Sequence, residues 1–179
     1  MAALLENLCE EIARNGFTKI ILFNGHGGNE SFLSQFVFRM LETPREFTLY
    51  VITLGDYLRP VLSSDKWKAQ MVSEFDEHGG EAETSLMLVI NPALVKMDQL
   101  SPAGTPQKRL AHLPCRTPVW WYADFPTHYA GDAKHATTKK GTYLLNAYTQ
   151  RVAEIIKAVK TDTEAPRLQA EYFARICHE

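Results

Sequence analysis

The stretch KIILFNGHGGN, residues 19–29, predicts the centre of the fold. Its opening residues, 19–23, form a short continuous apolar run, which is typical of a β-strand buried on both faces of a sheet. The run ends in a glycine-rich loop around His26, and Asn29 stands where its side chain can cap the next helix. That helix is expected over about residues 30–42, where apolar residues recur at helical spacing.

The flanking segments continue an alternation of helices and strands. An amphipathic helix is predicted over residues 2–15, with Gly16 at its C-terminal end. A second buried strand is predicted over residues 47–54. Helix, strand, helix and strand in this order predict an α/β domain whose parallel sheet is covered by helices. In such sheets ligands bind beyond the carboxyl ends of the strands, which is where His26 stands.

The rest of the chain contains a second histidine segment and a long aromatic loop. The segment EHGGEAETS, residues 77–85, leads into a helix predicted over residues 81–90. Residues 101–132 are rich in proline and aromatic side chains, which indicates an ordered loop rather than a flexible linker. An amphipathic helix is predicted over about residues 137–160, and a short terminal helix is expected around residues 168–176.

Composition excludes several classes of protein. The chain has 179 residues, of which 45% are hydrophobic, and a net charge of −2, so one domain is expected and the charge shows no footprint for nucleic acid. The three cysteines are odd in number and widely spaced, which favours a reducing cytoplasm over a disulfide scaffold. No apolar stretch reaches the roughly 18 residues that a membrane span needs, and no signal-peptide pattern opens the chain. We therefore expect a cytoplasmic protein without nucleic-acid or membrane partners.

Both histidine segments carry groups that suit metal-assisted hydrolysis. The second segment places three carboxylates close to His78, those of Glu77, Glu81 and Glu83. A neutral imidazole near carboxylates suits a divalent metal ion. Two rival enzyme classes fit less well, because the loop around His26 lacks the lysine of a phosphate-binding loop and the chain has no GxSxG nucleophile elbow. A metal-dependent hydrolase is therefore predicted.

The two segments, in this order and after a buried strand, resemble the motifs of the creatininase family of amidohydrolases. The resemblance covers about residues 1–160, so a partial domain is expected there, followed by a tail or short helix over residues 161–179. It implies a three-layer α/β/α fold with a mainly parallel sheet. It also implies a centre of two divalent metal ions (zinc, manganese or iron), hydrolysis of amides in small molecules, and assembly into homo-oligomers.

Site residues follow from the resemblance, position by position. His26 matches a metal-binding histidine, and Glu83 matches a metal-binding glutamate. His78 matches an active-site histidine that orients or protonates the substrate, and Glu77 beside it is a second candidate catalytic residue. Glu83 also has a simpler explanation, because the helix dipole favours a glutamate in the first turn of a helix. Glu77 and Glu81 are explained equally well as solvated charges at the start of that helix.

Candidate substrate contacts are loop backbones, where glycine lets a ligand approach closely, and aromatic side chains. They are Gly27, Gly28, Asn29, Gly79, Trp120 and Trp121. The two tryptophans are explained at least as well as packing residues. As a binding surface, aromatic faces with a few polar groups suit a sugar- or cyclitol-like ring.

The sequence departs from the family in two respects. The family's metal centre also uses a Glu-x-His pair and an aspartate from an N-terminal strand and loop, and nothing in this chain matches them. A domain without its N-terminal third is therefore expected. Members that cleave creatinine carry an acidic residue where this chain has Gly28, which argues against creatinine as the substrate. The alternative to an enzyme is a catalytically incomplete remnant that acts as a structural or oligomer component.

Overall fold

The computed structural model describes residues 1–176 and divides into two compact units. Unit 1 comprises residues 1–60 together with the described residues from Gln150 on, and unit 2 comprises residues 61–149. No helix within the described range is both long and apolar enough to cross a membrane.

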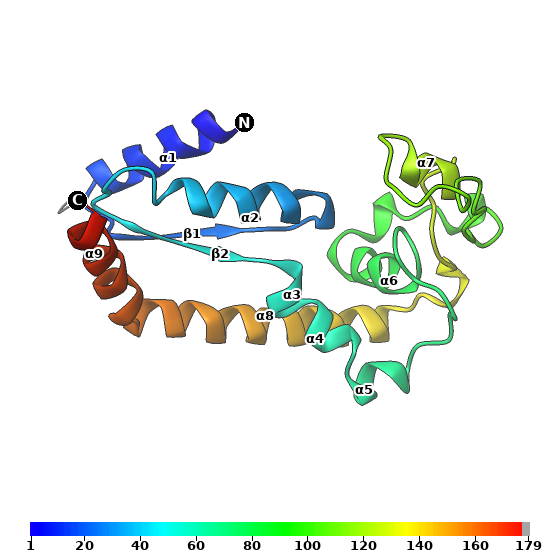
Figure 1. The fold of residues 1–179 in the computed structure, drawn as a ribbon. Helices are drawn as coiled ribbons and strands as arrows, with labels where there is room; N and C mark the ends of the chain where they lie inside the picture. Colours follow the sequence, from blue (N-terminus) through cyan, green and yellow to red (C-terminus); the bar gives the residue numbers. More distant parts are fainter. Residues whose placement is uncertain (177–179) are drawn as a thin grey trace. The chain divides into compact units, whose positions relative to one another are not determined.

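The described residues are mainly helical, with two strands among them (Figure 1). In chain order the elements are α1 (Ala2–Arg14), β1 (Lys19–Phe23), η1 (Gly27–Asn29), α2 (Glu30–Arg39), β2 (Thr48–Ile52), α3 (Leu54–Tyr57), α4 (Arg59–Leu62), α5 (Asp65–Lys68), α6 (Glu81–Ile90), η2 (Pro92–Leu94), η3 (Met97–Gln99), α7 (Trp120–Asp124), η4 (Ala133–His135), α8 (Thr138–Thr161) and α9 (Glu164–Ile176), where η marks a 3₁₀ turn.

Unit 1 contains a parallel sheet, which has two strands within residues 1–176. The strands β1 and β2 pair from Lys19 opposite Thr48 to Phe23 opposite Ile52. Because α2 connects them, the segment is a strand–helix–strand crossover, as a parallel pair requires. The predicted α/β class with a parallel sheet is confirmed.

Helices cover both faces of this sheet (Figure 1). On one face, α1 and α2 pack against the strands. The buried residues of that core are Cys9, Ile20, Phe36, Met40 and Phe47. On the other face, Lys19 donates to the carbonyl of Val159 near the end of α8, at 2.9 Å, and the hydroxyl of Tyr50 donates to Asp162 at 2.7 Å. Unit 1 is therefore layered α/β/α.

β1 is less buried than its apolar run predicts. Ile20 is buried, but Phe23, at the carboxyl end of the strand, is 53% exposed. A strand buried on both faces needs helices along its whole length and neighbours at both edges. Within the described residues β1 pairs with β2 alone, so the expectation of full burial is wrong.

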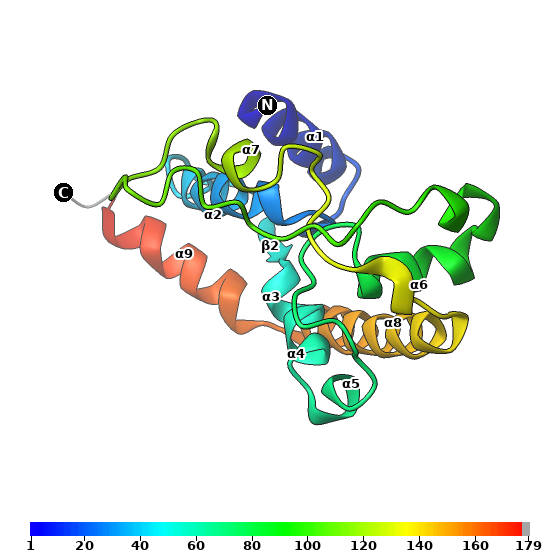
Figure 2. The ribbon, with the colours of Figure 1, turned by 90° about the vertical axis from the view of Figure 1, so that its right-hand side faces the viewer.

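Unit 2 is organised around α6, which lies alongside the first turns of α8 (Figure 1 and Figure 2). The close approach requires Gly141, because a Cβ at that position would lie 1.9 Å from the carbonyl oxygen of Ser85. The Ser85 hydroxyl is buried and accepts the N–H of Thr137 at 3.1 Å. The start of α8 is thus tied to the middle of α6.

Most of the predicted helices are present, with shifts at their ends. The helices α1, α6 and α8 lie where they are predicted, α2 ends earlier, at Arg39, and α9 begins earlier, at Glu164. The four short helices α3, α4, α5 and α7 were not predicted, because a single turn carries too little periodicity. Residues 101–132 form the expected ordered loop, and α7 lies within it. The domain boundary expected after residue 160 stays a prediction.

Candidate active site

The loop after β1 holds His26 at the start of the turn η1. Its Nδ1 accepts the backbone N–H of Gly28 at 3.1 Å, so the imidazole caps that turn. Asn29 was expected to cap α2, and this is wrong. Its side chain makes no cap hydrogen bond, and its Nδ2 donates instead to Oδ1 of Asn24 at 3.3 Å. His26, Gly27, Gly28 and Asn29 therefore lie together in one loop of unit 1.

Asn24 attaches this loop to the end of the sheet. It is only 2% exposed, and its backbone N–H donates to the carbonyl of Ile52 at 2.8 Å. Its Oδ1 accepts the N–H of His26 at 3.2 Å, and its carbonyl accepts the hydroxyl of Tyr57 at 3.1 Å. Burial raises the pKa of Tyr57, and the charge of Glu30 adds to this, which keeps the hydroxyl protonated as a donor. The position of His26 is thus fixed at the carboxyl end of β1.

The cap also determines how His26 could bind a metal ion. A neutral imidazole has one donor nitrogen and one acceptor nitrogen, and here Nδ1 is the acceptor. A metal ion bound at Nε2 requires the tautomer with its proton on Nδ1, and Nδ1 then cannot accept the N–H of Gly28. To act as a metal ligand, His26 has to release the N–H of Gly28.

His78, in unit 2, lies in a turn that a neighbouring segment holds in place. His78 and Ala130 exchange backbone hydrogen bonds of 2.8 and 2.9 Å, and the N–H of Glu77 also donates to the carbonyl of Ala130. Gly79 has a φ of +68°, which glycine adopts without strain, and it packs against the ring of Tyr129. The side chain of Glu77, a candidate catalytic residue, is exposed on this turn.

Glu83 lies beside His78 on the first turn of α6. Its Oε2 is 3.8 Å from Nδ1 of His78 and accepts the N–H of Gly79 at 2.7 Å. Gly79 precedes the N-cap residue Gly80, so this bond ties the turn before α6 to the first turn of the helix. The contact with His78 adds an acid beside an imidazole, on side chains that are 55% and 45% exposed. The structure therefore brings together three predicted site residues, His78, Gly79 and Glu83.

Asp76 stabilises the turn between His78 and the start of α6. Its Oδ2 accepts the N–H of Ala82 at 2.9 Å, which caps α6 from outside the helix. A Cβ on Gly80 would lie 1.8 Å from Oδ1, so the carboxylate fits only against a glycine. Burial raises the pKa of Asp76. The N–H groups of Ala82 and Glu81 lower it in part, and the charges of Glu81 and Glu83 raise it further.

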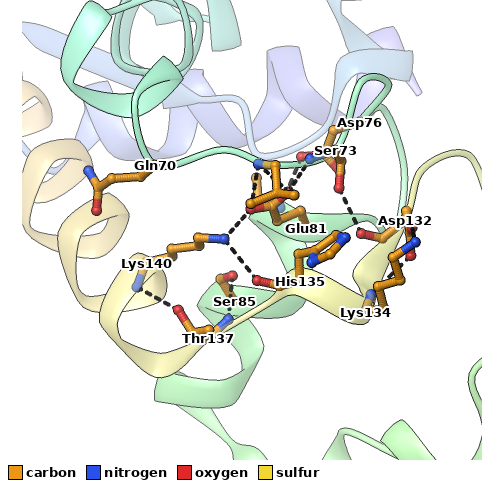
Figure 3. Close-up of polar contacts among 12 residues, drawn as sticks. Gln70, Ser73, Asp76, Glu81, Ser85, Asp132, Lys134, His135, Thr137 and Lys140 are labelled. Carbon is orange, nitrogen blue, oxygen red and sulfur yellow. Dashed lines mark hydrogen bonds and ion pairs between the residues drawn. The ribbon is translucent and has the colours of Figure 1, made fainter.

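Glu81 is fully buried and forms an ion pair with Lys140 of α8 (Figure 3). Its carboxylate also accepts the N–H groups of Val72, at 3.1 Å, and Ser73, at 2.7 Å. The ammonium of Lys140 donates in addition to the carbonyl of His135 at 2.9 Å. Burial alone would raise the pKa of Glu81, but the hydrogen bonds from Lys140, Ser73 and Val72 outweigh it and lower the pKa. Glu81 is thus a buried anchor between α6 and α8 rather than a solvated charge.

An aromatic cluster borders His78. The ring of Trp121 meets the imidazole edge-on, with 6.1 Å between ring centres and an angle of 89°. Trp121 also packs on Phe125, at 4.8 Å, and on Trp120, at 5.6 Å. Trp121 is therefore both a packing residue and a neighbour of the candidate catalytic histidine. Trp120, which is 46% exposed, extends the aromatic surface into solvent.

Neither unit by itself holds the set of donor groups that a two-metal centre needs. Across residues 1–176, no group of three or more His, Cys, Asp and Glu side chains is arranged to hold a metal ion. Unit 1 contributes His26, whose Nδ1 is engaged, and unit 2 contributes the pair His78 and Glu83. These residues fit part of a metal centre and not a complete one.

Sequence reasoning missed two residues that shape this site. Asp76 precedes the motif directly, and its sequence position resembles that of any exposed acid near a helix start. Lys140 stands next to Lys139, and no local signal separates them, because their difference arises from the packing of α8 against α6. Burial of one of two adjacent lysines is a tertiary effect.

Comparisons with known proteins find similar sequences and similar solved structures. The family model for creatininase (creatinine amidohydrolase) matches residues 1–156. A creatinine amidohydrolase from Pseudomonas putida is 28% identical over 167 residues, which are 88% of this chain and 62% of that protein. Among similar solved structures are a creatininase in a manganese form, 26% identical with a TM-score of 0.63, and a mutant creatininase of a Zn-Zn type, 25% identical with a TM-score of 0.64. Each match covers 87% of this chain and 62% of the solved chain.

The chain therefore spans about three-fifths (62%) of the length of these relatives. Both histidine segments lie inside the residues that the family model matches. On the match to the family model over most of its length, the chain belongs to the creatininase family.

Proposed function

We propose that this protein is a metal-dependent hydrolase that cleaves an amide or related bond in a small polar molecule. Membership of a family of amidohydrolases supports hydrolysis as the reaction class. The observation that carries the proposal is the pair His78 and Glu83, 3.8 Å apart at the start of α6 and partly open to solvent. An imidazole with a carboxylate beside it is suited to general acid–base catalysis.

In this proposal His78 handles the proton that hydrolysis has to move. Cleavage of an amide adds the hydroxyl of water to the carbonyl carbon, breaks the C–N bond and transfers a proton to the leaving nitrogen. His78 delivers that proton, and the carboxylate of Glu83 stabilises the imidazolium form. Trp121 packs edge-on against the imidazole. A positioned acid of this kind contributes about 10²- to 10⁴-fold to a rate.

The metal requirement is part of the same proposal, with His26 and Glu83 as candidate ligands. Glu83 would bind the ion through Oε1, because Oε2 accepts the N–H of Gly79 and faces His78. Zinc and manganese forms among the similar structures support a divalent ion. His26 stands at the carboxyl end of β1, the edge where α/β sheets bind ligands. The proton transfer assigned to His78 does not depend on which ion binds.

For the substrate, we propose a small ring-shaped molecule other than creatinine. At Gly28 the loop presents backbone where a side chain would crowd His26, because a Cβ there would lie 3.1 Å from Nδ1. The surface of Trp120 and Trp121 beside His78 suits a sugar- or cyclitol-like ring. The glycine backbones of Gly27 and Gly79 are the remaining candidate contacts.

One observation favours the alternative of a structural or oligomer component. On α1 and at Met1 just before it, apolar residues that face away from the core of unit 1 stay exposed. They are Met1 (80%), Leu4 (57%), Leu8 (50%) and Ile12 (41%). An exposed apolar stripe of this kind is typical of a surface that another polypeptide covers. A homo-oligomer is proposed on this ground and on family resemblance, and a cytoplasmic location on the free cysteines Cys9 and Cys115.

Metal content distinguishes the metal-dependent hydrolase from the structural or oligomer component. We would purify the protein without chelator and measure zinc, manganese and iron by elemental analysis, beside His26→Ala and Glu83→Ala. The exposed Glu74→Ala serves as the matched control. The hydrolase proposal predicts about two equivalents of metal, retained by the control and lost in the other two variants. Protein without metal, or metal that both variants retain, would support the non-enzymatic alternative.

A further inference from the structure

Arg116 is exposed and lies over the ring of Trp120, with no acidic partner among residues 1–176. Its guanidinium carbon lies 5.5 Å from the ring centre of Trp120. Across residues 1–176 this guanidinium makes no ion pair and no hydrogen bond. A guanidinium held over an aromatic ring can still donate from its N–H edge, and a carboxylate or phosphate can accept two such bonds in parallel.

The surrounding loop has an excess of positive charge. Residues 101–132 contain the cations Lys108, Arg109 and Arg116 against the acids Asp124 and Asp132, and no acidic residue lies between Asp98 and Asp124. Local charge of one sign raises the concentration of oppositely charged ligands at a surface. The loop therefore favours an anion at the end of the aromatic cluster.

The neighbouring arginine has a structural role that leaves Arg116 as the cation for a ligand. Arg109 donates to the carbonyl of Ala123 at 2.6 Å and to the carbonyl of Tyr122, and it lies 5.0 Å from the ring centre of Tyr122. These bonds use the last carbonyls of α7 and hold the helix that carries both tryptophans. The aromatic surface next to Arg116 is thus fixed in place before any ligand binds.

We propose that Arg116 and Trp120 form a binding subsite for the acidic group of a ring-shaped anion, a sugar-like carboxylate or phosphate. The ring packs against the exposed part of Trp120, and the acidic group accepts hydrogen bonds from the guanidinium. The subsite depends on the proposed function in one respect only, namely that the bound anion is taken to be the substrate of the hydrolase. Contacts from Trp120 to Trp121 and from Trp121 to His78 then lead from the subsite to the candidate catalytic histidine.

The subsite can be tested by binding alone. Intrinsic tryptophan fluorescence is titrated with glucuronate, with glucose as the same ring without the charge, and with acetate as the charge without the ring. The proposal predicts that glucuronate binds at least about tenfold more tightly than either of the others. Added salt should weaken the binding of glucuronate and leave that of glucose unchanged. Trp120→Phe should reduce the fluorescence response but not abolish it, because Trp121 remains next to the subsite, whereas Trp67, which is 1% exposed, is shielded from the ligand.

Variants of the arginine give the decisive comparison. In Arg116→Gln the affinity for glucuronate should fall to that for glucose, and Arg116→Lys should retain the charge preference in part. Arg14→Gln removes an arginine that is 75% exposed on α1 of unit 1, and should bind all three ligands as the wild type does. Calorimetry supplies affinities for Trp120→Phe, and circular dichroism checks that each variant is folded.

Three results would overturn the subsite. They are equal affinity for glucuronate and glucose, a preference for glucuronate that survives in Arg116→Gln, and no saturable binding of any of the three ligands. None of these measurements needs metal or turnover. A protein that binds glucuronate through Arg116 but contains no metal would support the subsite and contradict the hydrolase proposal. A protein that contains metal but does not bind glucuronate through Arg116 would support the hydrolase proposal and contradict the subsite.

Discussion

The two histidine segments are similar in sequence but use histidine in different ways. In unit 1 the imidazole of His26 accepts the N–H of Gly28 and so shapes its own loop. In unit 2 the turn around His78 is held by backbone bonds to Ala130 and by the bond from Gly79 to Glu83. The imidazole of His78 lies against a carboxylate and an aromatic ring.

The difference shows that the role open to a histidine in a glycine-rich loop depends on which groups stabilise that loop. Where the histidine itself supplies the cap, a ligand has to compete with a backbone N–H. Where other residues stabilise the turn, the imidazole is available for catalysis, but the fold has to provide those stabilising residues. Unit 2 supplies them through Asp76 and through the buried pair of Glu81 and Lys140.

The largest effect is expected from removing the cation of the buried pair. Lys140→Met leaves the carboxylate of Glu81 buried without its charged partner, which should lower the free energy of unfolding by about 3–5 kcal/mol. Lys139→Met, at the exposed neighbour, should change it by less than about 0.5 kcal/mol. Urea unfolding of both variants measures the difference. Equal effects would mean that the pair does not anchor α6.

A glycine in each loop tests how tightly the two segments are packed. Gly80→Ala places a methyl group 1.8 Å from Oδ1 of Asp76, whose carboxylate is held by Ala82, and should lower the free energy of unfolding by about 1–3 kcal/mol. At Gly25 nothing lies within 4 Å of a Cβ, so Gly25→Ala should cost less than about 0.5 kcal/mol. Thermal unfolding compares the two, and a larger loss in Gly25→Ala would contradict the packing described for the His78 turn.

Acid should weaken unit 2 through Glu81. Its pKa is lowered in the folded state, so its contribution to stability is complete above the ordinary value of 4.5 and is lost as the pH falls through the folded value. Asp76 acts in the opposite direction, because burial raises its pKa above 3.8 and protonation then favours the folded state.

Urea midpoints measured between pH 7 and pH 3 can separate the two groups. The double variant Glu81→Gln/Lys140→Met should lose the acid-dependent decrease that comes from Glu81, and Asp76→Asn should retain it. If the double variant weakens in acid as much as the wild type, the lowered pKa of Glu81 is not the cause.

Apart from the control substitutions, the smallest change in stability is expected at His26. His26→Ala removes the acceptor for the N–H of Gly28 and should cost about 0.5–1.5 kcal/mol. His26→Asn keeps an acceptor and should recover most of that loss, since asparagine is a good N-cap residue. If His26 is also a metal ligand, His26→Asn should lose metal while remaining stable. Metal content measured beside stability separates the two roles, and full metal retention would remove His26 from the centre.

The sequence predicts those features that local pattern controls. The apolar run of β1, the glycines of the His26 loop and the helix α6 are each recognisable within about ten residues, and all were placed correctly. The exposure of Phe23 was not predicted, because an apolar run does not reveal how many strands lie beside it.

Long-range contacts of the site were also beyond local pattern. Glu81 and Lys140 are 59 positions apart, so their pairing depends on how α6 packs against α8. The contact between His78 and Trp121 likewise joins a turn to a loop whose path the sequence does not define. The motif thus identified the chemical groups of the candidate site, and the structure identifies what holds them.

The most direct test of the proposed function is turnover by the metal-loaded protein. Zinc- and manganese-loaded wild type, His78→Gln and His26→Asn are incubated with a panel of small cyclic and linear amides, and amine release is measured. We expect hydrolysis above background in the wild type, reduced about 10²-fold or more in His78→Gln. Hydrolysis that His78→Gln leaves unchanged, or none in any loaded wild-type preparation, would contradict the assignment of His78 and Glu83 as the acid–base pair of a hydrolase.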